Sequence, residues 1–169
     1  AMDEACEALE GLSPDLLFCF VSSDFSDSYE DFSRELRRRF PRARIFGSSA
    51  SGTIGAGEEA EGVPAISLLG GETPDVEAEI FWLGEGEDAR WAERLQVQPE
   101  HQPLFLLLGD PFHKRMQMCI EELDKAFPAA AKAGGIASGT SAPMQSALFL
   151  DGAVHRQGTI GMALFGDIS

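Results

Sequence analysis

Glycine and hydroxyl residues gather in two short blocks of this 169-residue chain. Residues 47–53 read Gly-Ser-Ser-Ala-Ser-Gly-Thr, and residues 134–140 read Gly-Gly-Ile-Ala-Ser-Gly-Thr. Glycine permits positive φ and close backbone approach, and Ser and Thr hydroxyls beside exposed N–H groups could line a polar pocket. The alternative is a pair of turns whose hydroxyls satisfy nearby backbone groups. The sequence leaves both interpretations open.

Polar residues also follow two short apolar runs, at residues 16–21 and 104–108. Loops at the carboxyl ends of buried strands are where α/β sheets place binding groups. Together with the two blocks, these loops give the predicted ligand-binding set: Ser22, Ser23, Asp24, Gly47, Ser48, Ser49, Ser51, Asp110, His113, Gly134, Gly135, Ser138 and Thr140.

Two specific motifs, a phosphate-binding loop and a nucleophile elbow, fit the glycine blocks poorly. Residues 134–139 have the glycine spacing of a phosphate-binding loop, but Thr140 stands where the lysine belongs. The first block lacks the second glycine of a nucleophile elbow, because Ser51 occupies its place. The three histidines are isolated in the sequence. We therefore expect a binding protein with no catalytic residue, metal or cofactor; a hydrolase using Ser51 or Ser138 is the remaining enzymatic alternative.

Composition restricts the partners. The formal net charge is −15, with 44% hydrophobic and 24% charged residues. Nucleic-acid binding and adhesion to anionic membranes both need a basic surface, so neither is expected. Three widely spaced cysteines suggest neither a disulfide framework nor a zinc site. The longest apolar run is too short to cross a bilayer and no signal peptide is apparent, so we expect a cytoplasmic protein.

Six arginines fall between residues 34 and 44, in a chain with 13 basic residues. This cluster could dock an acidic partner. It could also be the solvated end of a helix, where cations suit the helix dipole. Both interpretations stay open at this stage.

The elements that carry these residues form a repeat. A shift of 87 residues, with no gap, aligns residues 16–53 with residues 103–140 and gives 13 identities over 38 positions. Unrelated sequence of this composition would give roughly two or three. The alignment pairs Phe40-Pro41 with Phe127-Pro128, where proline ends both predicted helices. Internal duplication is the favoured interpretation.

The predicted fold is a mixed α/β domain spanning residues 1–169. Two strand-helix-strand-strand units, at about 14–71 and 101–167, are expected to be related by a pseudo-twofold axis, with apposed sheets and helices outside. The linker at about 72–100 should hold a strand at 76–83 and a short helix at 88–95. A hairpin is expected at 147–157, turning at Asp151-Gly152. The acidic stretches 58–61 and 85–88 are predicted as solvated loops.

These motifs resemble the FIST family, named for F-box and intracellular signal transduction proteins. The block Gly-Ser-Ser-Ala-Ser-Gly-Thr-Ile-Gly at residues 47–55 is similar to a hallmark of that family. The segments on either side of this block, residues 17–22 and 64–68, are also similar to those that flank it in the family. Residues 107–112, 133–139 and 158–164 are similar to its second half. In the family pattern a cysteine often follows the first glycine, where this chain has Ser48.

The resemblance implies an N-terminal FIST domain that acts as a sensory module. Bacterial members of the family are proposed to bind small molecules such as amino acids and to control signalling outputs. Eukaryotic members occur in F-box proteins, so the alternative function is substrate recognition for a ubiquitin ligase. A C-terminal FIST domain is expected in the full-length protein, and the partner is either a small molecule or a protein.

Overall fold

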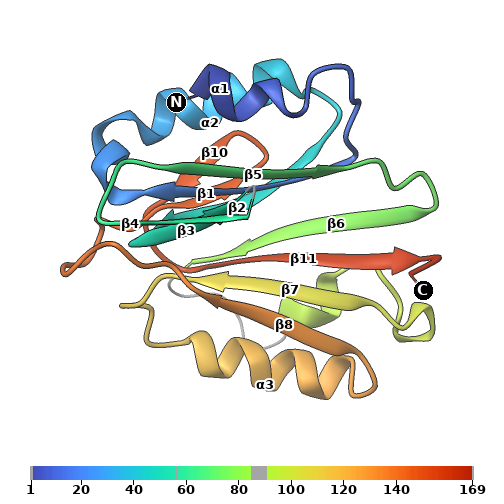
Figure 1. The fold of residues 1–169 in the computed structure, drawn as a ribbon. Coiled ribbons are helices and arrows are strands. Elements are labelled where there is room, and N and C mark those ends of the chain that lie inside the picture. The colour runs from blue at the N-terminus through green and yellow to red at the C-terminus, as the bar shows by residue number, and fades with distance from the viewer. Residues whose placement is uncertain (1, 56, 85–90, 169) are drawn as a thin grey trace.

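Two β-sheets stack face to face between outer helices (Figure 1). The computed structural model describes residues 2–55, 57–84 and 91–168. α1 and α2 cover the outer face of the first sheet, and α3 covers the outer face of the second. The predicted mixed α/β class, with apposed sheets and helices outside, is confirmed.

The elements follow the predicted order closely. The first elements along the chain are α1 Met2–Glu7, β1 Leu16–Ser22, η1 Ser23–Ser28, α2 Tyr29–Arg39, β2 Arg44–Ala50, β3 Gly52–Gly55, β4 Glu58–Glu61, β5 Ile66–Gly71 and β6 Val76–Leu83. The remaining elements are η2 Trp91–Arg94, η3 Pro99–His101, β7 Leu104–Gly109, α3 Met116–Ala126, β8 Ala131–Ile136, β9 Leu148–Leu150, β10 Ala153–His155 and β11 Thr159–Gly166. The labels η1 to η3 denote 3-10 helices.

The strand orders show a common three-stranded core in each sheet. The first sheet runs β10-β9-β2-β1-β5 and the second runs β6-β11-β7-β8, while β3 and β4 pair with each other. β1 pairs parallel with β2 and antiparallel with β5; β7 pairs parallel with β8 and antiparallel with β11. Parallel neighbours need a crossover connection, and α2 and α3 provide one for each sheet.

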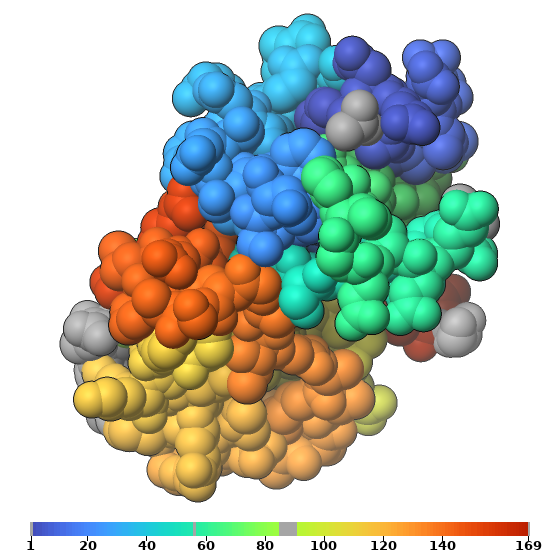
Figure 2. All heavy atoms as spheres, turned by 60° about the vertical axis from the view of Figure 1, so that its left-hand side comes forward, coloured from blue at the N-terminus to red at the C-terminus, as the bar shows by residue number. Residues whose placement is uncertain are grey.

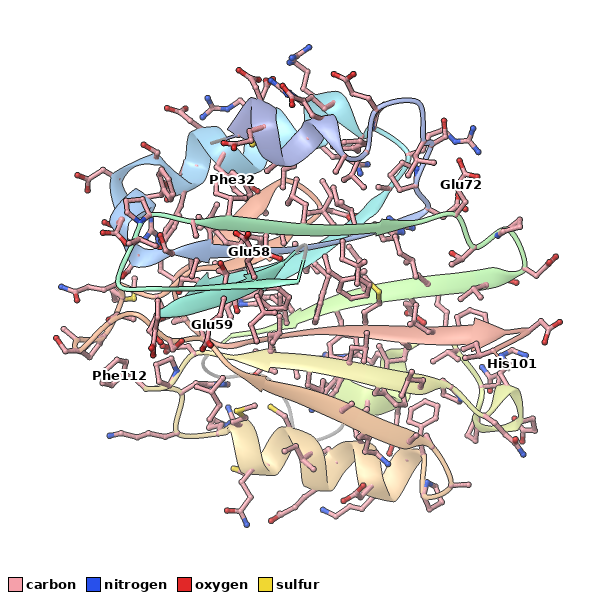
Figure 3. All side chains as sticks on the ribbon, in the orientation of Figure 1. Phe32, Glu58, Glu59, Glu72, His101 and Phe112 are labelled. Carbon is pink, nitrogen blue, oxygen red and sulfur yellow. The ribbon has the colours of Figure 1, made fainter. Side chains whose placement is uncertain are left out.

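α2 forms where apolar residues recur at helical spacing. Tyr29, Phe32 and Leu36 are buried, and Phe32 lies between the helix and the first sheet (Figure 3). The helix ends at Arg39, because Pro41 disfavours helical conformation in the preceding residue. α3 ends at Ala126, two residues before a proline, for the same reason.

Three apolar clusters hold the layers together. One fills the space between α1, α2 and the first sheet, and another fills the space between α3 and the second sheet. The third lies between the sheets and comprises Leu16, Phe46, Leu108, Ala137, Leu148, Leu150, Ile160, Met162 and Leu164. Because each fully buried large side chain contributes about 1.5–3 kcal/mol, the inter-sheet cluster is what fixes the two halves against each other.

The predicted hairpin is confirmed, and it crosses to the other half of the molecule. Asp151 and Gly152 form its turn with φ of 47° and 92°, as a two-residue hairpin turn requires. β9 follows β8 in the chain but pairs with β2 in the first sheet. β6, from the linker, pairs with β11 in the second sheet. Each sheet therefore contains a strand from outside its own strand-helix-strand unit.

The two glycine blocks are not the pair of turns that one interpretation of the sequence predicted. Gly47, Ser48 and Ser49 lie within β2, and Gly134 and Gly135 lie within β8. The prediction failed because glycine is uncommon in strands unless another backbone approaches closely, which is the situation here.

Two further predictions need correction. Residues 58–61, expected as a loop, form β4, whose Glu58 and Glu59 are labelled in Figure 3. Antiparallel pairing with β3 outweighs the low strand propensity of glutamate. In place of the helix expected at 88–95 the structure has η2 at Trp91–Arg94. Residues 85–90 lie outside the described part of the chain.

The ungapped repeat alignment is wrong by one residue in the first strand. α2 begins at Tyr29 and α3 at Met116, which preserves the shift of 87. Leu17, however, pairs with Ile45, and it is Phe105 that pairs with Lys132, so the strands correspond at a shift of 88. A one-residue slip would turn every side chain to the opposite face. Descent of the two units from one duplicated ancestor stays a prediction.

Candidate functional site

The two glycine blocks meet at the carboxyl ends of β2 and β8. Ser49 Oγ donates to the carbonyl of Ser138 (3.1 Å) and accepts from the N–H of Ala147 (3.1 Å). Ser138 N–H donates to the carbonyl of Ser49 (3.1 Å), and Ser138 Oγ accepts from the N–H of Ser51 (3.0 Å). Figure 2 shows the teal and orange segments meeting here. These contacts match one part of the second interpretation, that the hydroxyls satisfy backbone groups, although much of each block lies in a strand rather than a turn.

Gly47 and Gly134 are required by the close approach of neighbouring strands. A Cβ atom on Gly47 would lie 1.8 Å from the carbonyl oxygen of Cys19. A Cβ atom on Gly134 would lie 1.9 Å from the carbonyl oxygen of Leu107. The repeated glycine is therefore a packing requirement of each parallel strand pair.

A pocket of about 370 Å³ opens between the sheets beside this junction. We call it the inter-sheet pocket. Its walls are aromatic and aliphatic side chains of β1, β2 and β7, with small residues of β8 and three serines. The lining comprises Phe18, Phe20, Phe46, Ser48, Ser49, Ala50, Leu106, Leu107, Leu108, Gly134, Gly135, Ile136 and Ser138. Small-molecule sites typically have volumes of about 300–1,000 Å³.

Part of the pocket exists because β8 carries a glycine where β2 carries a serine. Ser48 of β2 faces the second sheet and lines the pocket. Gly135 occupies the corresponding position of β8, and no atom lies within 4 Å of the point where its Cβ would be. Space that a side chain on β8 would fill is therefore left open.

The chemistry of the inter-sheet pocket is neutral. None of its lining residues has an ionisable side chain, and its polar groups are serine hydroxyls and backbone atoms. Burying a charge without a partner costs several kcal/mol or more. The pocket therefore suits an uncharged, largely apolar ligand.

Ser22, Ser23 and Asp24 lie outside the lining of this pocket. Ser22 is buried at the end of β1, where its Oγ accepts from the N–H of Ala65 (3.1 Å) and its carbonyl accepts from Tyr29 Oη (3.3 Å). Ser23 is half-buried and Asp24 is exposed, both in η1. Ser22 therefore fixes the end of the strand.

Asp110, His113 and Thr140 also form bonds within the protein. Buried Asp110 accepts from Ser146 Oγ (2.8 Å), and His113 Nδ1 lies 3.1 Å from Thr159 Oγ1. Thr140 Oγ1 donates to the carbonyl of Ala142 (2.9 Å). These contacts hold the loops at one end of the second sheet, where Figure 3 labels the exposed Phe112.

Neither metal ligation nor thiol chemistry has an evident centre in the described part of the chain. Within it, no group of three or more His, Cys, Asp or Glu residues is placed to hold a metal ion. Cys6, Cys19 and Cys119 are buried and unbridged. Burial raises the pKa of each of these thiols above its ordinary value, which keeps them protonated and weakly nucleophilic near neutral pH.

The arginine cluster is largely paired within the molecule. Arg38 and Arg39 both donate to Glu35, and their hydrogen bonds hold the pKa of that carboxyl at about 2. Arg34 pairs with Asp31 at 2.7 Å. These contacts favour the solvated helix end over a free cationic docking patch, so the cluster gives no support to docking of an acidic partner.

A second, larger hollow of about 800 Å³ lies at the other end of the inter-sheet space. We call it the charged hollow. Its polar groups are largely engaged: Arg44 pairs with Asp151 (2.8 Å), and Glu79 accepts from the N–H of Val97 (2.9 Å). His101, labelled in Figure 3 at this end, stacks on Phe165. These contacts join neighbouring elements.

The aromatic wall of the inter-sheet pocket was not predicted from the sequence. Phe18 and Phe20 belong to an apolar run that was expected to form a buried strand, yet Phe20 is 36% exposed. The signal was their alternation with Leu17 and Cys19, which turn toward α2. Phe46 joins them from β2.

Residues 15–169 match the FIST N domain. The chain belongs to the FIST family. FIST domains are sensory domains of signal-transduction proteins, so the resemblance found in the sequence is confirmed at the level of the family. In this FIST domain, no helix among the described residues is long and apolar enough to cross a membrane.

Two uncharacterized proteins from two strains of Mycobacterium tuberculosis, MT0656 and Rv0628c, are similar to this FIST domain. Each is 27% identical to it over 167 residues. The alignment covers 98% of this chain and 43% of each relative. The chain therefore spans less than half the length of the curated relatives that it matches.

Proposed function

We propose that this FIST domain senses a small, neutral molecule that binds in the inter-sheet pocket. The observation that carries the proposal is the pocket itself: about 370 Å³, without an ionisable lining group, and next to the junction of the two glycine blocks. Five of the residues predicted for ligand binding line it: Ser48, Ser49, Gly134, Gly135 and Ser138.

The lining selects a ligand class. Phe18, Phe20 and Phe46 offer aromatic surface, and Ser48 offers a hydroxyl for a single polar group of the ligand. A free amino acid would bring a carboxylate and an ammonium group into a pocket without a charged partner. We therefore favour a neutral aromatic or aliphatic compound over the amino acids suggested by the family resemblance.

The site supports binding rather than catalysis. Ser51 Oγ lies 3.4 Å from Ser138 Oγ, and Ser138 Oγ accepts from a backbone N–H. A serine nucleophile needs a base at hydrogen-bonding distance. Among the described residues, no histidine or carboxylate hydrogen-bonds either hydroxyl. We accordingly propose a non-enzymatic sensor within a longer cytoplasmic signalling protein that includes a C-terminal FIST portion.

A thermal-shift screen of neutral metabolites and amino acids tests the proposal. Gly135→Phe should place a ring in the inter-sheet pocket, and Leu69→Phe is the matched control, because Leu69 is 68% exposed and does not line that pocket. At a hundredfold excess over Kd, a ligand adds about 2.7 kcal/mol of stability and shifts Tm by several degrees.

We expect at least one neutral compound to raise the Tm of the wild type and of Leu69→Phe but not of Gly135→Phe. The proposal fails if every active compound stabilises Gly135→Phe equally. It also fails if only charged amino acids stabilise the protein, or if no compound does.

A further inference from the structure

β8 is the outer strand of the second sheet, and no strand of the described residues pairs with its far edge. The sheet order ends at β8, which lies beside α3 at the margin of the molecule in Figure 1. Five of its six residues are exposed, including Ile136 at 59%. Open strand edges present unpaired backbone groups and invite another strand.

Hydrogen bonding shows which β8 groups face outward. The N–H of Ala137, just past β8, donates to Gly109 of β7 (2.9 Å). Because backbone groups of successive strand residues alternate in direction, those of Lys132, Gly134 and Ile136 point away from β7. These are the groups that a further strand would bind.

The first sheet shows what occupies the corresponding edge. β2 follows α2 as β8 follows α3, and the outer edge of β2 carries β9 in antiparallel pairing. Phe149 of β9 lies opposite Gly47 and packs on Tyr29 and Phe32 of α2, with ring centroids 5.4 Å apart in both pairs. Leu148 and Leu150 turn instead into the space between the sheets.

The same arrangement is vacant on β8. Gly134 corresponds to Gly47, and beside it lies a hollow of about 270 Å³ on the α3 side of the sheet. Met116 and Ile120 of α3 line this hollow, and Met116 corresponds to Tyr29. The space and its apolar walls match what one large side chain, such as that of Phe149, would need.

We propose that β8 accepts an antiparallel strand whose central residue is a large apolar or aromatic side chain seated against Met116 and Ile120. Residues on either side of it would lie along the mouth of the inter-sheet pocket, since Gly135 and Ile136 border both spaces. Main-chain pairing supplies affinity and the alternate side chains supply specificity, as in other strand-addition complexes.

The strand comes from the longer polypeptide that contains this domain. The curated relatives have ample chain for it, because the matched region is 43% of their length. A second copy of β8 fits less well, since antiparallel pairing centred on Gly134 would bring a glycine rather than a large side chain to the hollow. A ligand in the inter-sheet pocket and a strand bound to β8 would then both lie next to Gly135 and Ile136.

Amide hydrogen exchange tests the proposal without a ligand. Exchange at Lys132, Gly134 and Ile136 is compared between this 169-residue chain and the full natural polypeptide, with the outward amides of β6, on the opposite edge of the sheet, as reference. We expect at least tenfold slower exchange at the three β8 amides in the full polypeptide. Equal rates in both proteins would overturn the proposal, as would protection in the isolated domain that rises with its concentration, which indicates a second copy.

Two substitutions on α3 form a matched pair for the same measurement. Ile120 lines the hollow and is 36% exposed, whereas Met118 is 45% exposed and does not line it. In the full polypeptide, Ile120→Glu should abolish the protection of the β8 amides and Met118→Glu should leave it. Retained Tm of both variants in the isolated domain shows that each still folds. Loss of protection in both variants, or in neither, contradicts the proposal that the hollow holds the central side chain of the added strand.

Discussion

Glycine at two positions of this domain is fixed by backbone contact rather than by turn geometry. Gly47 and Gly134 each sit where a Cβ atom would overlap a carbonyl oxygen of the adjacent parallel strand. Gly135, next along β8, has open space at the same point. Glycines of the two blocks thus have different roles: Gly47 and Gly134 permit strand packing, and Gly135 leaves pocket space open.

Alanine substitutions separate these two roles. Gly47→Ala and Gly134→Ala should each lower the free energy of unfolding by about 3 kcal/mol, because strands must separate to admit the methyl group. Gly135→Ala should change it by less than about 0.5 kcal/mol, as exposed substitutions do. Urea denaturation measures all three. A similar loss of unfolding free energy in Gly135→Ala and Gly47→Ala would show that Gly135, like Gly47, is required by close backbone packing.

At the scale of elements, the β9–β10 hairpin links the second half of the chain to the first sheet. Asp151 occupies its turn with φ of 47°, and its Oδ1 accepts from the N–H of Ile45 (2.8 Å). Its Oδ2 accepts from Arg44 (2.8 Å). One side chain therefore stabilises the turn and ties it to β2.

Asp151→Ala should lower the free energy of unfolding by about 2–3 kcal/mol, since it removes both bonds and puts alanine at positive φ. Asp151→Asn is the matched variant: asparagine tolerates this conformation and keeps an acceptor, so a smaller loss is expected. Thermal and urea unfolding of both variants measure the difference. An equal loss in both would mean that the charge on Asp151, rather than the turn, provides the stability.

The sequence predicted many of the helices and strands well. It did not predict that β9 pairs with a strand from the other half of the chain. Pro41 and Pro128 marked the ends of α2 and α3, and β6 was predicted with its observed bounds Val76–Leu83. The Asp-Gly pair marked the hairpin turn, yet no local signal indicates that β9 pairs with β2, because strand pairing depends on contacts about a hundred residues apart. Of the residues predicted for ligand binding, three serines and two glycines line the candidate pocket. Its phenylalanine wall was missed, since short apolar runs do not reveal which face opens onto a cavity.

At the scale of the whole molecule, the two sheets are also joined by a stacked aromatic pair. His155 of β10 in the first sheet stacks on Trp82 of β6 in the second, with ring centroids 4.6 Å apart. Burial lowers the pKa of His155 below its usual value of about 6.5. The neutral imidazole is therefore the form that belongs to the folded state.

This shift makes stability depend on pH. Because the folded-state pKa is depressed, the contribution is complete above the unfolded pKa of about 6.5 and is lost as pH falls below it. We expect Tm to decline between pH 7 and pH 5, and His155→Phe, which keeps an aromatic ring against Trp82, to flatten the decline. The same slope in wild type and variant would assign the pH dependence to other groups.

Both halves of the domain wall the inter-sheet pocket, so a ligand there contacts both sheets at once. Leu106 and Leu108 border it from β7 and Ile136 from β8, whereas Ile80 lies at the charged hollow. These methyl groups report separately on the two spaces, and none of them needs to be substituted.

The most direct test is a methyl NMR titration of the domain with the strongest compound from the thermal-shift screen. The account predicts saturable shifts at Leu106, Leu108 and Ile136, with Ile80 unchanged. Shifts centred on Ile80, or stabilisation without any change at the three pocket methyls, would contradict binding in the inter-sheet pocket.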